Sequence, residues 1–122
     1  MLLVGGTRAL AAPADVTALR VELAAPAACP AEPSLLARVQ RHTTRVREAK
    51  EGDVARVLAL GIAARGDGFV GDLRLLDPGD ELDPGGELER TIPGKACEEV
   101  LAAAALIAAL TIDPHASATP AP

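Results

Sequence analysis

The stretch VARVLALGIAARGDGFVGDLRL, residues 54–75, decides the fold class. Residues 54–64 alternate between large apolar and small side chains, which is typical of a half-buried strand. Three large residues share one face of that strand: Leu58, Leu60 and Ile62. The Gly-Asp-Gly run at residues 66–68 tolerates the positive φ of a tight turn, and residues 69–75 continue as a second strand. The stretch therefore predicts an antiparallel hairpin.

Further strands are expected on both sides of this hairpin. Residues 17–23 alternate with Leu19, Val21 and Leu23 on one face, which predicts an earlier strand. An acidic loop with two Pro-Gly turns follows the hairpin, and residues 87–92 form a fourth short strand after it. The sheet should thus contain four strands.

Two helices complete the pattern. The first is predicted from Ala31 to Thr44, after a proline-rich break that suits a helix start. The second is an alanine-rich segment from Lys95 to Leu110, whose wide apolar surface indicates burial against the sheet.

The element order β-α-β-β-β-α predicts an α+β fold. We expect a four-stranded, largely antiparallel sheet with both helices on one face. A chain of 122 residues fits one domain with one modest core. That domain is predicted to cover residues 16–114.

The composition argues against two classes of ligand. Aromatic residues make up 1% of the chain, with Phe69 as the one example, so stacking platforms for sugars or single-stranded nucleic acid are not expected. The net charge of -5 disfavours binding to a polyanion. We predict no nucleic-acid partner and no cofactor.

The two ends of the chain resemble targeting and linker segments. Residues 1–15 combine a short apolar run with an A-x-A site that would be cut after Ala11, as at the end of a secretory signal peptide. The alternative is a flexible N-terminus. No stretch is long enough to span a membrane. Residues 115–122 have the Pro/Ala composition of a disordered linker that would lead to a further domain.

Cys29 and Cys97 are the sharpest chemical signal. They lie just before the first predicted helix and near the start of the second, so the two helix starts would meet if the helices pack side by side. In an oxidising compartment a disulfide is the default, whereas in the cytosol both thiols stay reduced. A reactive thiol at a helix N-terminus is the third possibility, although there is no C-x-x-C motif.

Arg38, Arg41 and Arg45 repeat at helical spacing and share one face of the first predicted helix. Such a stripe could bind phosphate or carboxylate groups of an envelope polymer or an acidic partner. A solvated helix face balanced by nearby acidic residues explains the same pattern. The arginines are candidates for anion or partner binding.

Metal and catalytic signals are weak. The acidic loop, residues 77–87, suits calcium in composition but lacks the spacing of an EF-hand loop. His42 and His115 have no ligand at zinc spacing, and Ser34 and Ser117 lie in no G-x-S-x-G context. We predict no metal site and no catalytic residue.

Three segments carry a resemblance to a known family: Ala28-Cys29-Pro30 before a helix, then Ala96-Cys97-Glu98-Glu99-Val100, and finally Ile112-Asp113-Pro114. Together they resemble uncharacterised exported domains of high-GC predatory soil bacteria, over about residues 16–114. The resemblance implies a periplasmic module that follows a signal peptide, with a cysteine pair and a Pro/Ala linker. It implies no activity.

These observations favour a non-catalytic exported interaction or accessory module of the cell envelope. Its partner would be another envelope protein or a domain beyond the tail. The alternatives are a thiol-dependent redox protein that uses Cys29 and a cytosolic structural protein with reduced cysteines.

Overall fold

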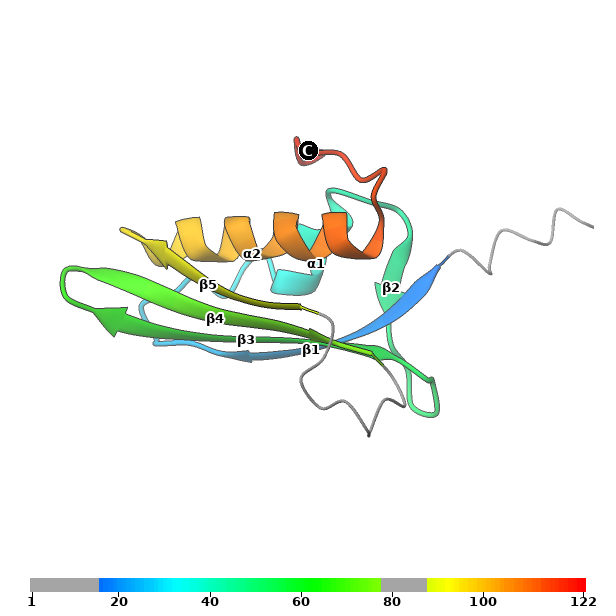
Figure 1. Cartoon of the computed structure of the whole chain (residues 1–122), viewed down its shortest axis with the longest axis horizontal. Helices are drawn as coiled ribbons and strands as arrows, with labels where there is room; N and C mark the ends of the chain where they lie inside the picture. The colour runs from blue at the N-terminus through cyan, green and yellow to red at the C-terminus, as the bar shows by residue number, and fades with distance from the viewer. Residues whose placement is uncertain (1–15, 78–87) are drawn as a thin grey trace, which may run out of the picture.

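The computed structural model has an α+β fold with a five-stranded mixed sheet and two helices, and it describes residues 16–77 and 88–122 (Figure 1). The predicted signal segment lies outside the described residues, as does all of the acidic loop except Asp77. The elements, in chain order, are β1 (Thr17–Ala24), α1 (Leu35–Gln40), β2 (Val46–Glu48), β3 (Arg56–Arg65), β4 (Gly68–Leu76), β5 (Leu88–Gly94) and α2 (Cys97–Ile112).

The strand order is β2-β1-β3-β4-β5. β3, β4 and β5 form an antiparallel meander, and the predicted hairpin is confirmed, with Arg65 opposite Gly68 and Gly66 at a φ of 63° in the turn. β1 runs parallel to both β2 and β3. The predicted α+β sheet is therefore confirmed in its class, but it has five strands instead of four, and two of its four strand pairings are parallel.

The fifth strand is β2, which the sequence analysis missed. It has three residues, too few to show an alternating pattern. α1 crosses from the end of β1 back to the start of β2, and such a crossover makes the two strands parallel. The β-α-β unit therefore accounts for the parallel edge of the sheet.

α1 is also shorter than the predicted segment from Ala31 to Thr44. It begins after Ser34, whose hydroxyl accepts a hydrogen bond from the N–H of Ala37 at 3.1 Å. It ends at Gln40, and beyond it the hydroxyl of Thr43 accepts the N–H of Arg45 at 3.0 Å. Local side-chain bonds of this kind favour a turn over another helical turn.

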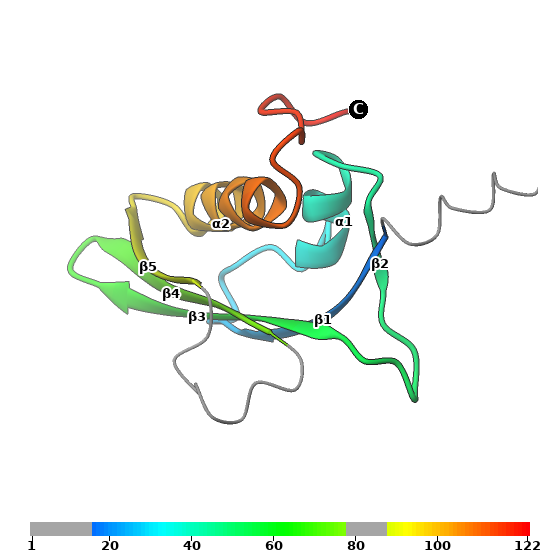
Figure 2. The same ribbon diagram turned by 45° about the vertical axis from the view of Figure 1, so that its right-hand side comes forward.

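Both helices lie on the same face of the sheet, as predicted, with α2 over the β4 and β5 half and α1 over β1 (Figure 2). The core between these layers consists of leucine from the strands and alanine from α2. The largest fully buried side chains are Leu19, Leu58, Leu60, Leu73, Leu75, Leu101, Val39 and Val100. Because its buried face carries Ala104, Ala105, Ala108 and Ala109, α2 can approach the sheet closely.

The tail after α2 does not extend away from the domain. The N–H of Ser117 donates to the carbonyl of His42, and the N–H of Ala121 donates to the carbonyl of Arg41, both at 2.8 Å. The composition of residues 115–122 predicted a disordered linker, and these bonds instead hold the segment against the end of α1. No helix in the described ranges is long and apolar enough to cross a membrane.

Candidate functional site

The predicted disulfide between Cys29 and Cys97 is present. It joins the loop that follows β1 to the first residue of α2, with 5.4 Å between the two Cα atoms. Cys97 is buried, whereas Cys29 is half-buried and packs at the margin of the core. The bond therefore fixes the start of α2 over the sheet.

Arg38 is buried and does not lie in a surface stripe, and its ion-pair partner is Glu98, the residue that follows Cys97. Its guanidinium donates two hydrogen bonds to the carboxylate of Glu98, at 2.7 and 2.8 Å, and its Nε donates to the carbonyl of Pro33 at 3.0 Å. These bonds satisfy the buried charge and join α1 to the first turn of α2. The hydrogen bond from Arg38 lowers the pKa of the Glu98 carboxyl.

The other two predicted anion-binding residues lie at a different place. Arg41 caps the end of α1, and Arg45 lies in the connection to β2. Both line an open hollow of about 370 Å³ beside His42 and His115, and Arg38 is not part of it. The structure thus separates the three arginines, because α1 ends too early to align them. Anion binding by Arg41 and Arg45 stays a prediction.

A buried polar cluster forms the floor of this hollow. The hydroxyl of Thr43 donates to Asp113 at 2.7 Å, and the N–H of His115 donates to the same carboxylate at 2.9 Å. The Nδ1 of His42 donates to the carbonyl of Ser117 at 2.7 Å. The hydrogen bond from Thr43 is the main cause of the lowered pKa of Asp113. The cluster holds the tail in place. Asp113 was noted from the sequence only as part of the Ile112-Asp113-Pro114 segment, and neither it nor Thr43 was assigned a role.

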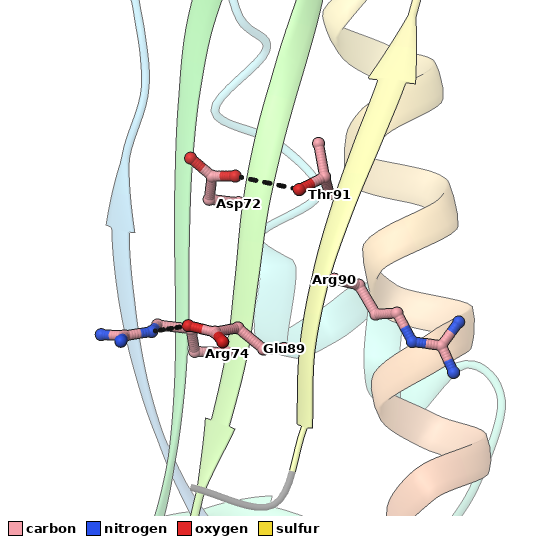
Figure 3. Close-up of a pocket in the computed structure, with 5 residues that line it drawn as sticks. All are labelled: Asp72, Arg74, Glu89, Arg90 and Thr91. Atoms are coloured by element: carbon pink, nitrogen blue, oxygen red, sulfur yellow. Dashed lines mark hydrogen bonds and ion pairs between the residues drawn. The ribbon is translucent and has the colours of Figure 1, made fainter. Parts of the chain in front are cut away.

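A second open depression, of about 530 Å³, lies along β4 and β5 (Figure 3). Three of its four charged side chains take part in cross-strand pairs. Arg74 donates to Glu89 at 3.0 Å, the hydroxyl of Thr91 lies 3.5 Å from Asp72, and Arg90 points to the opposite side of the sheet (Figure 3). Such pairs stabilise neighbouring strands and leave no set of groups aimed at one point.

A third hollow, of about 520 Å³, lies between the edge of β1 and the start of α1, and we call it the β1-edge cleft. Its lining is mainly apolar and includes Leu19, Val21, Leu23, Ala31, Leu35 and Leu36, while the polar residues at the cleft are Arg20, Ser34 and Glu48. Leu23, at the rim of this cleft, is 44% exposed. No local pattern in the sequence predicts this cleft, because the cleft depends on where β2 ends.

The residues that the structure describes contain no group of three or more His, Cys, Asp or Glu side chains placed to hold a metal ion. The calcium hypothesis concerned the acidic loop, of which residues 78–87 lie outside the described ranges.

Comparisons with protein-family models, with curated proteins and with solved structures found no match. The resemblance to exported domains of predatory soil bacteria therefore stays a prediction. Functional proposals for this chain have to start from its own geometry.

Proposed function

We propose that this chain is an exported, non-catalytic binding module of the cell envelope. The observation that carries the proposal is the disulfide between Cys29 and Cys97. Structural disulfides persist in oxidising compartments such as the bacterial periplasm and are rare in the reducing cytosol.

The bond suits a domain with a core poor in large side chains. It closes a long loop, with a sequence separation of 68, which in the chain-entropy model stabilises the fold by about 4 kcal/mol. Typical domains have a total stability of about 5 to 15 kcal/mol. A domain of this composition would therefore depend on an environment that keeps the cysteines oxidised.

A binding role is supported by how the described surface is arranged. In the depression on β4 and β5, Arg74 is paired with Glu89 and Asp72 with the hydroxyl of Thr91. In the hollow beside His42, the carboxylate of Asp113 accepts the hydroxyl of Thr43 and helps to hold the tail. The β1-edge cleft instead presents apolar side chains, including the exposed Leu23. Exposed apolar surface of this kind is typical of sites where another molecule binds.

The proposal is tested in the source organism by fractionation combined with thiol trapping. Cells are quenched in acid, and the protein is treated with a maleimide reagent that shifts each free cysteine on a gel. We expect the protein in the envelope fraction with no free thiol. A cytosolic protein with two reactive thiols would contradict export, and a version with Cys97→Ala provides the marker for one free thiol.

A thiol-dependent redox protein is the second candidate. It is favoured by the position of Cys97 at the first residue of α2, since a helix N-terminus stabilises a thiolate. Alkylation of the reduced protein at neutral pH tests it. If Cys29 and Cys97 react no faster than free cysteine, the redox function is excluded and the structural role stands.

A further inference from the structure

The β1-edge cleft lies along the part of β1 that β2 does not reach. β2 pairs with residues 17–19 of β1 and with no others, while β3 pairs with residues 19–24 on the opposite side. Among the residues that the structure describes, residues 20–24 therefore have a neighbouring strand on one side and none on the other, and we call this second side the free edge. Figure 1 shows β2 lying beside the start of β1, with the rest of β1 continuing along β3.

The end of β2 is produced by a turn that directs the chain away from this edge. The carboxylate of Asp53 accepts the N–H of Lys50 at 2.7 Å and a hydrogen bond from Arg47 at 2.9 Å. Gly52 has a φ of 90°, a conformation that favours glycine. The free edge is therefore a defined feature of the fold and begins where this turn leaves the sheet.

The backbone at this edge presents a regular set of donors and acceptors. The N–H of Thr17 donates to Arg45, and the carbonyl of Leu19 accepts the N–H of Ala49, so the odd-numbered residues of β1 direct their polar groups toward β2. By the alternation of a strand, Val21 and Leu23 direct their N–H and carbonyl groups to the same side. No described strand lies there to pair with them.

The side chains beside these groups are apolar on the helix side of the sheet. Val21 is half-buried and Leu23 exposed, and Leu36 and Ala31 face the same cleft from α1 and the loop before it. Arg20 and Glu22 alternate with Val21 and Leu23 along β1, and both are exposed, with no ion-pair partner among the described residues. Arg20 also lines the cleft. The unpaired backbone groups of this edge are thus flanked by mainly apolar side chains on the helix side of the sheet and by charged side chains on the other side.

From this arrangement we propose that residues 20–24 of β1 bind an extended segment of a partner protein, which adds to the sheet as a strand in line with β2. The segment places apolar side chains at every second position into the β1-edge cleft. Its intervening positions lie on the other face, with a basic side chain opposite Glu22. This proposal rests on the proposed binding function and names its site and the chemistry of its partner.

Pairing with a second copy of the same chain is disfavoured by charge. In an antiparallel pair of β1 edges that uses both Val21 and Leu23, each Val21 would lie opposite the other copy's Leu23. Glu22 would then lie directly opposite Glu22, and like charges in that position are destabilising. A register centred on Val21 would bring the partner chain onto residue 19, where β2 already pairs. A register centred on Leu23 would pair only residues 22–24 of each strand, because β1 ends at Ala24. A different polypeptide is therefore the better occupant.

The test measures binding of short blocked peptides to the full chain by fluorescence anisotropy. The probe is the labelled heptapeptide TVKVTVT, which alternates valine with polar residues and carries one lysine. Its matched control, VVTKTTV, has the same composition without the alternation. We expect saturable binding of the first peptide and at least about ten-fold weaker binding of the second, a difference that corresponds to 1.4 kcal/mol.

Substitutions at Leu23 separate the backbone from the side chain. Leu23→Pro removes the N–H that points to the free edge without removing a bond of the β1–β3 ladder, and should weaken binding by about ten-fold or more. Leu23→Val keeps the donor and the apolar contact, and should bind within about two-fold of the parent. Glu22→Lys should reverse the preference, so that TVEVTVT binds more tightly than TVKVTVT.

Two N-methylated peptides give the same test without changing the protein. One carries N-methyl groups on the three valines and the other on three polar residues, and only one of these sets of nitrogens faces β1. Exactly one of the two peptides should lose binding. If both bind, if the scrambled peptide binds equally well, or if no peptide saturates by about 1 mM, the proposal is overturned.

Sedimentation velocity tests whether a second copy of the same chain occupies the edge. A dimer of the parent chain that Leu23→Pro dissociates would overturn the proposal by assigning the edge to a second copy. Peptide binding by a protein found reduced in the cytosol would contradict export and leave the docking site intact. An exported protein that binds no peptide would contradict the docking site alone.

Discussion

Asp113 is the residue that connects the end of α2 to the tail. It is buried, and its carboxylate accepts hydrogen bonds from the hydroxyl of Thr43 and from the N–H of His115. These bonds favour the charged form and lower its pKa below the ordinary value of 3.8, with a further contribution from the nearby charge of Arg45. A single side chain therefore links the turn after α1, the end of α2 and the start of the tail.

This linkage predicts a pH dependence of stability. Because the folded-state pKa of Asp113 is lowered, its contribution is fully present above the unfolded pKa near 3.8 and is lost as the pH falls through the folded pKa. Asp113→Asn should be less stable than the parent at neutral pH, and the difference should shrink below about pH 4. Urea unfolding at several pH values measures it.

Thr43→Val provides the matched variant, since it removes the main cause of the pKa shift while keeping the carboxyl group. It should also reduce the dependence of stability on pH in the acid range. If the free energy of unfolding falls equally steeply with pH for the parent and for Asp113→Asn, folding does not lower the pKa of Asp113, and the prediction is wrong.

At the scale of elements, the distance between α2 and the sheet depends on small residues on both sides. A β-carbon at position 71 in β4 would lie 2.5 Å from Cγ1 of Val100 and 3.2 Å from Cδ1 of Leu60. Gly71 is therefore required by the close approach of α2. Gly61, opposite Asp72 on β3, has no atom within 4 Å of the corresponding position.

The two glycines give a matched pair of variants. Gly71→Ala should lower the free energy of unfolding by about 1 to 3 kcal/mol, because the well-packed layer under α2 has to shift. Gly61→Ala should leave stability unchanged or raise it by up to about 1 kcal/mol, since alanine restricts the unfolded chain. Urea midpoints with unchanged m-values measure both effects. Equal stability of the two variants would contradict the packing of α2 on β4.

At the scale of the whole molecule, the disulfide and the Arg38–Glu98 pair act at the same place. Both connect the region around α1 to the first turn of α2, which lies far away in the sequence. The tail contacts near His42 tie the other end of α2 to the end of α1. Contacts therefore hold α2 to the region around α1 at both ends of α2.

Reduction should therefore destabilise the entire fold. Loss of the disulfide is expected to lower the free energy of unfolding by about 4 kcal/mol, given the sequence separation of 68 between the cysteines. Thermal unfolding with and without dithiothreitol measures the change. The double variant with Cys29→Ala and Cys97→Ala should match the reduced parent and should not respond to the reductant. A parent protein with the same melting temperature in both conditions would contradict this role.

The sequence by itself determined the strands and the helix in which a regular hydrophobic pattern extends over many residues. The hairpin of residues 54–75, the strand from residue 17 and the alanine-rich helix all follow from local patterns, because periodicity and turn chemistry act over a few residues. The tertiary structure decided the rest. β2 exists because α1 returns the chain beside β1, and the turn that ends α1 is held by the hydrogen bond from Thr43 to the distant Asp113.

The separation of Arg38 from Arg41 and Arg45 follows from the early end of α1 and from the partner of Arg38, Glu98, which lies 60 residues away. The β1-edge cleft likewise depends on where a three-residue strand stops beside an eight-residue one. Such features depend on contacts between distant parts of the chain, and no local pattern in the sequence encodes which segment lies beside which.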